Sequence, residues 1–376
     1  MRKMLFETML SGHRMEYIHH IYMGMIEHPS DEYVIVVPKE FEEKKGLYDW
    51  PKVDNICFKF IEEENASAND DNGLLKESFS KTKLLRKYVL QEQPESVFLI
   101  SLMAYIPFLP LLIPKSVNVS GILYKIYLYR WSKSSWKTKI GDVLKFLLIS
   151  GRNCIKTVFV LNDAPSAQVF NKLYHTKKFR YITDPYNVLH YKPINLRDEL
   201  AIPKNNNVFL HFGGLSRRKG TLVILEAIKL MNEEVRKTCT FIFAGRVYSP
   251  IHDEFYSHIK ELTTNCNIIV FDEFVSNERL ADLCVTCDFI LAPYSNTIQS
   301  SGVLGHAANY ERPVIGPANG LVGKLIRRNQ LGIAMKDINS VELARVMSEV
   351  KPHKLQSSYK STITVRSFID TIFDSF

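Results

Sequence analysis

The stretch DFILAPYSNTIQSSGVLGHAANYERPVIG, Asp288 to Gly316, carries the pattern of a complete strand–loop–helix–strand unit. An apolar run, Asp288–Ala292, leads into a polar loop, a helical pattern over Val303–Tyr310 and a second apolar run, Pro313–Gly316. Short continuous apolar runs are typical of strands that are buried on both faces of a parallel sheet. Because Pro313 cannot continue the helix, the second run begins a new element. The stretch therefore predicts a βα crossover into a parallel strand.

The same alternation of apolar runs and helical patterns extends along nearly the whole chain. The other predicted strands are Lys3–Leu10, Tyr33–Val37, Ile56–Phe60, Ser96–Ser101, Val117–Leu123, Thr157–Leu161, Val208–Phe212, Thr240–Ala244, Asn267–Phe271 and Gly332–Lys336. The other predicted helices include Arg14–Ile26, Ser80–Gln91, Thr221–Met231, Asn277–Cys284 and Ser340–Val350. This order predicts the α/β fold class with parallel sheets.

The length of 376 residues exceeds what one hydrophobic core usually holds, so we expect two domains. Ile182–Asn207 contains three prolines and an asparagine run, which is typical of a linker. The predicted parts are an N-terminal domain over 1–186, a linker over 187–207, a C-terminal domain over 208–355 and a C-terminal segment over 356–376 that packs back on the N-terminal domain. Both domains are predicted to be Rossmann-like sheets that face a cleft between them.

The chain is moderately basic, with 48 Lys and Arg residues against 40 Asp and Glu residues. This excess fits an anionic partner such as a nucleotide, a phospholipid surface or a nucleic acid. The cations are spread along the chain, and no helix-turn-helix, zinc or RNA-recognition signature is present, so nucleic-acid binding is not predicted. The polar stretch Glu62–Gly73 predicts a mobile surface loop.

The six cysteines are scattered and lie mostly in apolar runs, which predicts free buried thiols in a reducing cytoplasm. Cys284 and Cys287 have the spacing of half a zinc site, but two further ligands are missing, so we expect no metal there. Glu7 interrupts the N-terminal apolar stretch too early for a signal peptide. Tyr105–Pro114 is short and broken by three prolines, so it is expected to pack against the sheet or to touch a membrane, not to cross one.

Loops that follow strands are the candidate binding site, because ligands of open parallel sheets bind beyond the carboxyl ends of the strands. His211–Thr221, HFGGLSRRKGT, combines glycines that permit a close approach with cations beside a helix N-terminus, which is suited to an anion. Ala244–Pro250 adds a further glycine and arginine, a weak signal by itself. The candidate residues of these two loops are Gly213, Gly214, Arg217, Arg218, Lys219, Gly245 and Arg246.

A third loop lies within the opening stretch. Ser300, Ser301 and Gly302 are predicted to form the first turn of its helix, where unpaired N–H groups and hydroxyls could bind a diphosphate. The alternative is an ordinary helix cap without a ligand.

Together the three loops resemble the nucleotide-sugar glycosyltransferases of the GT-B fold, in particular the retaining group 1 family (family four). The family motif Gly-Arg-Leu-x-x-x-Lys-Gly is matched by Gly213–Gly220, and its strand ending in glycine by Phe241–Gly245. Asp288 stands at the usual acidic position before a strand, and His306–Ile315 matches Glu-Ala-Met-Ala-x-Gly-x-Pro-Val-Ile. The resemblance covers about Val208–Val350; before that only the layout and the Ser11–Gly12–His13 loop are similar.

The chain departs from the family at several positions. Gly214 replaces the usual arginine, so Arg217 or Arg218 has to supply the second cation. The paired glutamates, spaced by seven residues, are missing: the second is His306. The first falls near Ile298 or Gln299, where the sequence is similar to the Gln-Ser-Gly-Val version of some polysaccharide-building relatives. Altered contacts to sugar or ribose hydroxyls and a loss of activity are both compatible with these changes.

The resemblance implies transfer of a sugar from a UDP- or GDP-sugar to a saccharide or lipid-linked acceptor, with retention and without a metal or other cofactor. It also implies a role in making O-antigen, capsule or exopolysaccharide. The implied catalytic residues are Lys219, Arg218 and His306. His13, which follows the first predicted strand, is a further candidate for contact with the acceptor or a phosphate; the alternative is a helix-capping or merely exposed histidine. The implied residues that bind the nucleotide sugar are Gly12, Gly213, Gly214, Arg217, Gly245, Arg246, Phe274, Gln299, Ser300, Ser301, Gly302 and Val303.

Leu123–Leu148 mixes lysines and arginine with tyrosine and tryptophan, a composition that suits an anionic membrane interface. It predicts a cytoplasmic protein attached peripherally to the inner face of the cell membrane. The alternative is a loop and an amphipathic helix that cover the core.

Two other functions are compatible with Rossmann-like sheets. A non-catalytic sugar-nucleotide-binding protein would differ from the enzyme only in the absence of turnover. A nicotinamide oxidoreductase is disfavoured, because it requires Gly-x-Gly-x-x-Gly after the first strand and this chain has only Gly12 there.

Overall fold

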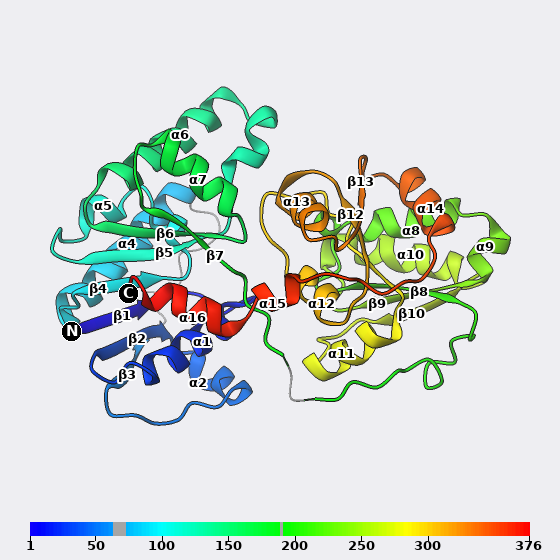
Figure 1. The fold of residues 1–376 in the computed structure, drawn as a ribbon, viewed down its shortest axis with the longest axis horizontal. Coiled ribbons are helices and arrows are strands. Elements are labelled where there is room, and N and C mark those ends of the chain that lie inside the picture. Colours follow the sequence, from blue (N-terminus) through cyan, green and yellow to red (C-terminus); the bar gives the residue numbers. More distant parts are fainter. Residues whose placement is uncertain (63–72, 189–190) are drawn as a thin grey trace. The chain divides into compact units, whose positions relative to one another are not determined.

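The computed structural model describes residues 1–62, 73–188 and 191–376, apart from the side chain of Leu47. It contains two compact units (Figure 1). Unit 1 comprises Met1–Asp184 and Val365–Phe376, and unit 2 comprises Pro185–Thr364. The predicted loop Glu62–Gly73 lies almost entirely outside the described residues. Each unit is an α/β unit with a parallel sheet, as the sequence predicts.

The described strands of unit 1 form one parallel sheet in the order β3-β2-β1-β4-β5-β6-β7. They are β1 (Arg2–Phe6), β2 (Glu32–Pro38), β3 (Ile56–Ile61), β4 (Ser96–Leu99), β5 (Asn118–Leu123), β6 (Ile155–Leu161) and β7 (Phe179–Ile182). The prediction of a first strand to Leu10 was wrong. The chain turns after Phe6 because the Glu7 carboxylate accepts the N–H groups of Thr8 and Met9 at 2.8 and 3.0 Å.

The edge strand β7 was not predicted, because only its first and last residues are buried and the run lacks a continuous apolar pattern. The helices of unit 1 are α1 (Arg14–Ile26), α2 (Phe41–Lys44), η1 (Lys45–Leu47), α4 (Leu74–Glu92), η2 (Leu102–Tyr105), α5 (Leu109–Leu112), η3 (Tyr127–Lys133), α6 (Trp136–Gly151), α7 (Ala164–Leu173) and α16 (Val365–Phe373). The start of α4 precedes the predicted helix by six residues, since its first leucines, Leu74 and Leu75, are exposed and do not follow the amphipathic pattern.

The C-terminal helix α16 completes the core of unit 1. Gly24 of α1 leaves space that the side chains of Phe373 and Ile369 fill. Phe368 is fully buried, and its ring centroid lies 5.0 Å from that of Tyr17. The red α16 therefore belongs with the blue α1 in Figure 1 although the two lie at opposite ends of the chain.

The proline-rich stretch Tyr105–Pro114 packs into unit 1, which is the first of its two predicted alternatives. Tyr105, Ile106, Leu109 and Ile113 are buried, whereas Leu111 is exposed.

The described strands of unit 2 also form one parallel sheet, in the order β10-β9-β8-β11-β12-β13. They are β8 (Asn207–Phe212), β9 (Cys239–Ala244), β10 (Asn267–Phe271), β11 (Phe289–Leu291), β12 (Val314–Pro317) and β13 (Gly332–Met335). The helices are η4 (Arg217–Lys219), α8 (Thr221–Leu230), α9 (Glu233–Lys237), η5 (Ser249–Ile251), α10 (His252–Leu262), α11 (Asn277–Thr286), α12 (Val303–Asn309), α13 (Gly320–Arg328), α14 (Ser340–Glu349) and α15 (Tyr359–Thr362). The crossover predicted from Asp288–Gly316 is confirmed as β11, α12 and β12, and Ile290 pairs in parallel with Val314.

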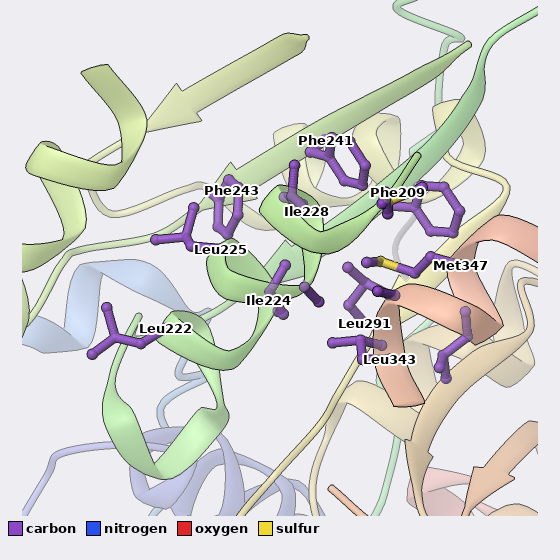
Figure 2. Packing of buried hydrophobic residues seen from close by; sticks show 14 of the residues in the cluster. Phe209, Leu222, Ile224, Leu225, Ile228, Phe241, Phe243, Leu291, Leu343 and Met347 are labelled. Carbon is purple, nitrogen blue, oxygen red and sulfur yellow. The ribbon is translucent and has the colours of Figure 1, made fainter. Parts of the chain in front are cut away.

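The core of unit 2 is formed where α8 covers the sheet (Figure 2). Aromatic rings from β8 and β9 and aliphatic side chains of α8 and α14 pack together in one buried cluster. The labelled members on α8 recur at helical spacing, which explains why the amphipathic pattern predicted this helix. These include Ile224, Leu225 and Ile228 of α8, Phe209, Phe241 and Phe243 of the strands, and Leu343 and Met347 of α14.

The described part of the predicted linker packs against unit 2. The Tyr191 hydroxyl donates to the Asp282 carboxylate at 2.9 Å, and the Leu196 N–H donates to the Thr286 hydroxyl at 2.8 Å. The Arg197 guanidinium lies 2.7 Å from the carboxylate of Asp288. No local sequence pattern reveals these polar contacts, so the composition indicated only that the segment is a linker.

The cysteines are free thiols, and Cys284 and Cys287 are buried. Burial raises the pKa of both thiols above the ordinary value for cysteine. Among the described residues, no group of three His, Cys, Asp or Glu side chains is arranged to hold a metal ion. Likewise, no described helix has the length and apolar composition needed to span a bilayer.

Replacing Phe368 by Ala should destabilise unit 1 by about 3–5 kcal/mol, because the change removes a fully buried ring from its core. All three tryptophans, Trp50, Trp131 and Trp136, belong to unit 1, so tryptophan fluorescence during urea unfolding reports on this unit. Asp374→Asn, which changes an exposed side chain of the same C-terminal segment, is the control. A loss below about 1 kcal/mol for the alanine variant would contradict the packing of α16.

Candidate functional site

The loops after β8 and β11 meet at the point where the strand order of unit 2 reverses. From β8 the chain first extends the sheet through β9 and β10, and later extends it on the other side of β8 through β11, β12 and β13. Such a switch point opens a crevice beyond the carboxyl ends of the two central strands, where ligands of parallel sheets bind. The candidate residues of unit 2 come mainly from these loops and from the loop after β9.

The main chain is packed very closely at this edge of the sheet. The N–H of Gly213 donates to the Ala244 carbonyl at 2.9 Å, and that of Leu215 donates to the Arg246 carbonyl at 2.8 Å. A side-chain carbon on Gly245 would overlap the main chain of Gly213. Gly213 has a φ of 90°, which side-chain-bearing residues rarely adopt. The loops after β8 and β9 are therefore fixed against each other by their backbones.

Lys219 lies over this glycine backbone. Its ammonium group donates to the carbonyl of Phe212 at 3.3 Å and occupies the space where a side chain on Gly213 would begin. The same ammonium lies 5.6 Å from the ring centroid of Tyr294, which follows β11. The contacts with Phe212 and Tyr294 hold the charge of Lys219 at the carboxyl end of β8. The residue is half-buried, so part of its side chain remains open to solvent.

Tyr294, in the loop after β11, contacts two candidate phosphate-binding residues, Lys219 and Ser301. Its ring is buried, and its hydroxyl accepts a hydrogen bond from the Ser301 hydroxyl at 3.3 Å. The structure thus brings Lys219 and Ser301 to the same aromatic side chain. Tyr294 was not among the residues predicted from the sequence; its position directly after the strand in LAPY was the available signal.

His306 of α12 lies beside the end of β8. Its ring makes edge contacts with Phe212 and Tyr186, at centroid distances of 5.3 and 5.0 Å. The Tyr186 hydroxyl lies 3.4 Å from Nδ1 of His306. Phe212 therefore contacts both His306, through its ring, and Lys219, through its carbonyl. Two of the predicted catalytic residues of unit 2, Lys219 and His306, thus share Phe212 as a neighbour.

The prediction that Ser300, Ser301 and Gly302 form the first turn of the helix was wrong. The helix α12 begins at Val303, with Gly302 as the capping residue, so the two serines lie in the preceding loop. The N–H of Leu304 donates to the Ser301 carbonyl at 3.1 Å and that of His306 to the Gly302 carbonyl at 3.2 Å, so these two residues precede the helix and accept its first N–H groups. Val303 is buried in the core, and Gln299 is half-buried in the loop.

The arginines lie at the rim of the site. Arg217 is exposed and pairs with Glu254 of α10, which directs its charge toward that helix. The Arg218 carbonyl accepts the N–H and the hydroxyl of Ser295 at 3.1 and 3.2 Å, while its side chain is exposed. Arg246 is likewise exposed. Phe274, which follows β10, is 79% exposed.

Gly12 and His13 belong to unit 1 and follow β1. Gly12 has a φ of 70° with open space around it, and His13 caps α1 with an exposed ring. Nδ1 of His13 lies 3.3 Å from the Glu16 carboxylate. Burial opposes the charge on Glu16, but hydrogen bonds from His13 and His20 lower the pKa of Glu16 to about 2. The Glu16 side chain is therefore a carboxylate anion, and it lies beside His13, the residue predicted to contact the acceptor.

His211, which no local sequence pattern marks as functional, forms a buried hydrogen-bond chain below Lys219. Nδ1 donates to the Leu291 carbonyl at 2.9 Å, so Nε2 accepts from the Thr221 hydroxyl at 3.0 Å. The Thr221 hydroxyl in turn accepts the Ser216 N–H at 2.9 Å. Desolvation by burial is the main cause that lowers the pKa of His211, to about 4. This chain fixes both ends of the turn that carries Lys219.

Residues 206–350 match the family model of group 1 glycosyl transferases. Unit 2 carries a group 1 glycosyltransferase domain. The match includes the loops after β8, β9 and β11, and thus Lys219, Tyr294 and Ser301. No curated protein sequence matched the chain.

Solved glycosyltransferase structures are similar over nearly the whole chain. HepE of Anabaena, in complex with UDP and glucose, is 16% identical with a TM-score of 0.64, over 99% of this chain and 94% of HepE. WaaG, a glycosyltransferase involved in lipopolysaccharide biosynthesis, is 14% identical with a TM-score of 0.64, over 93% of this chain and 90% of WaaG. Sucrose-phosphate synthase from Thermosynechococcus elongatus is 11% identical with a TM-score of 0.64, over 99% and 94% of the two chains. These similarities establish the GT-B fold.

The buried His211 makes the free energy of unfolding depend on pH. Its pKa is about 4 in the folded protein, against an ordinary value of 6.5. Since the unfolded chain binds the proton more readily, the contribution is complete above pH 6.5 and is lost as the pH falls toward 4. Between pH 7 and pH 4.5 the loss should be roughly 2.5 kcal/mol.

Urea unfolding followed by far-UV circular dichroism at these two pH values should show this loss in the unaltered protein. It should be much smaller in His211→Gln, whose amide can also donate but does not titrate. The control is His353→Gln, an exposed histidine of the same unit. An unchanged pH dependence in His211→Gln would contradict the assignment.

Proposed function

We propose that this protein transfers a sugar from a nucleotide diphosphate sugar to a saccharide or lipid-linked saccharide, and that the diphosphate binds at the carboxyl ends of β8 and β11. The observation that carries the proposal is the convergence of Lys219 and Ser301 on Tyr294 at the switch point of a group 1 glycosyltransferase domain. A fixed cation and a hydroxyl above closely packed backbone are suited to an anion.

Glycosyl transfer requires stabilisation of the negative charge that develops on the leaving diphosphate. Lys219 is already placed by its contacts with Phe212 and Tyr294, so it can stabilise this charge with little rearrangement. The exposed guanidinium of Arg218 supplies the second cation, and Ser300 and Gly302 supply further N–H groups. We propose that no metal or other cofactor takes part, because these groups supply the electrostatic stabilisation.

The proposed reaction proceeds with retention of configuration. The acceptor hydroxyl attacks from the face of the leaving group, and a phosphate oxygen of the leaving diphosphate takes its proton, so no side-chain base is required. His306 and Gln299 orient the sugar nucleotide. His13, oriented by Glu16, and the open backbone at Gly12 contact the acceptor in unit 1.

The similar structures support a particular class of substrate. HepE was solved with UDP and glucose, and WaaG is described as acting in lipopolysaccharide biosynthesis. We propose a UDP- or GDP-sugar as substrate and the synthesis of cell-surface polysaccharide as the role. A non-catalytic sugar-nucleotide-binding protein is the second candidate, because His306 replaces one of the paired glutamates of the family and the other is absent.

The outward face of α6 supports peripheral attachment to a membrane. Four large apolar side chains are about half exposed or more, and their spacing places them on one side of the helix, opposite the buried Phe146 and Ile149. A surface helix of a globular protein normally presents polar residues outward. The four exposed residues are Trp136, Ile140, Leu144 and Leu147.

Cations surround this apolar stripe. Lys137 lies over the ring of Trp136 and Lys139 over that of Trp131. Between Leu123 and Gly151 the sole acidic residue is Asp142, and Arg130 neutralises it at 2.7 Å. Apolar side chains with adjacent lysines fit an anionic bilayer surface, where the rings enter the interface and the cations meet lipid phosphates. We propose that unit 1 binds the cytoplasmic face of the membrane in this way.

Replacing Lys219 by Ala should lower sugar transfer by roughly 100- to 1,000-fold, because one preorganised charge is lost from the transition state. The unaltered protein should be stabilised against heat by UDP or GDP or by their sugars, since a ligand of the folded state raises its stability. Addition of EDTA should leave the rate unchanged.

Lys229→Ala, which removes an ion pair with Glu261 on the surface, is the matched control. Full turnover by Lys219→Ala would overturn the phosphate assignment. Binding without turnover for any sugar nucleotide and acceptor would instead favour the non-catalytic candidate.

The double variant Trp136→Ser/Leu144→Ser should bind vesicles of phosphatidylcholine and phosphatidylglycerol at least about tenfold more weakly than the unaltered protein, because two exposed apolar side chains no longer enter the interface. Cosedimentation measures the bound fraction. Val341→Ser, an exposed apolar residue of unit 2, is the control. Equal binding by the double variant, or no binding by the unaltered protein, would contradict the membrane assignment.

A further inference from the structure

Tyr248 is an exposed aromatic residue whose backbone is fixed beside the candidate site. It follows β9, and 57% of its surface is exposed. Its N–H donates to the Leu215 carbonyl at 3.0 Å, and the N–H of Leu215 donates to the Arg246 carbonyl at 2.8 Å. These bonds form a parallel bridge between Leu215 and Val247. The segment that carries Tyr248 is thus attached directly to the loop that carries Lys219.

The ring of Tyr248 rests on Gly214. A side-chain carbon on Gly214 would overlap the ring and would lie 3.1 Å from the phenolic oxygen. The backbone of Gly214 therefore supports one side of the ring, and the exposed fraction of the side chain is open to solvent. A tyrosine held in this way offers a hydroxyl and an aromatic surface at a small cost in side-chain entropy.

The two consecutive glycines accommodate two different side chains. The space at Gly213 is occupied by the ammonium of Lys219, and the space at Gly214 by the ring of Tyr248. The group 1 motif has an arginine at the position of Gly214, and such a side chain would need the space that Tyr248 fills. An arginine at 214 and a tyrosine at 248 in its present position are therefore mutually exclusive.

We propose that Tyr248 contacts the bound nucleotide sugar, donating a hydrogen bond from its hydroxyl to the diphosphate beside Lys219. The inference rests on the function proposed above. Tyr248 then supplies a neutral hydrogen-bond donor where the family motif has a cation. With one fewer fixed charge, nucleotide binding should weaken less with added salt than it would with an arginine at 214.

The test is isothermal titration of UDP and GDP into the unaltered protein and six variants. Tyr248→Phe should bind about tenfold more weakly, because a hydrogen bond to a charged group is lost. Gly214→Arg should also bind more weakly, since the new side chain competes with the tyrosine ring for one space. In Gly214→Arg/Tyr248→Ala binding should recover beyond that of Tyr248→Ala alone, with a steeper dependence on salt.

Tyr181→Phe, an exposed tyrosine of unit 1, is the control for the loss of a hydroxyl, and circular dichroism checks that each variant is folded. Unchanged affinity in both Tyr248→Phe and Tyr248→Ala, together with a loss in Lys219→Ala, would overturn this inference alone. Binding of neither nucleotide by the unaltered protein would overturn the proposed function and this inference together.

Discussion

The site in unit 2 depends on one steric constraint, the contact of main chain with main chain where β8 and β9 end. Gly245 can lie against the main chain of Gly213 because Gly245 carries no side chain, and a side chain on Gly220 would overlap the carbonyl of Pro293 after β11. Three loops are thereby held together without intervening side chains. The side chains that do enter, Lys219 and Tyr248, fill the spaces that the glycines leave. The chemistry of the site follows from this arrangement, because a charge and a hydroxyl are placed before any ligand arrives.

The electrostatics of the site come from few groups. His211, directly beneath it, is held neutral by burial, and Arg217 is paired with Glu254 on the surface. Lys219 is the cation that lies on the packed backbone itself. A neutral histidine below a lysine avoids two like charges in a poorly solvated region, and its hydrogen-bond chain to Thr221 and Ser216 keeps the turn in place. Hydrogen bonds between neutral groups therefore fix the turn that positions the charge of Lys219.

Much of this fold could be predicted from sequence, because buried parallel strands are continuous apolar runs and their connecting helices are amphipathic. The strands β8 to β13 and the helix α1 follow these local patterns closely. The glycines after β8 and Lys219 could be found because they stand together in one short motif, HFGGLSRRKGT, directly after a predicted strand. Tyr294 and His211 could not, since their roles depend on contacts between strands far apart in sequence. The start of α12 at Val303 follows its pattern, but the place of Ser300 and Ser301 in the loop before it could not be predicted, because it depends on how this loop packs.

The assignment of the diphosphate to the ends of β8, β9 and β11 is tested most directly by hydrogen–deuterium exchange with and without UDP or GDP. Binding at this site should slow exchange in peptides that cover 211–221, 244–248 and 294–306, because their amides become hydrogen-bonded or less able to open. Exchange in the remaining peptides of unit 2 should change little. Unchanged exchange in these three segments, together with slower exchange elsewhere in the chain, would contradict the account.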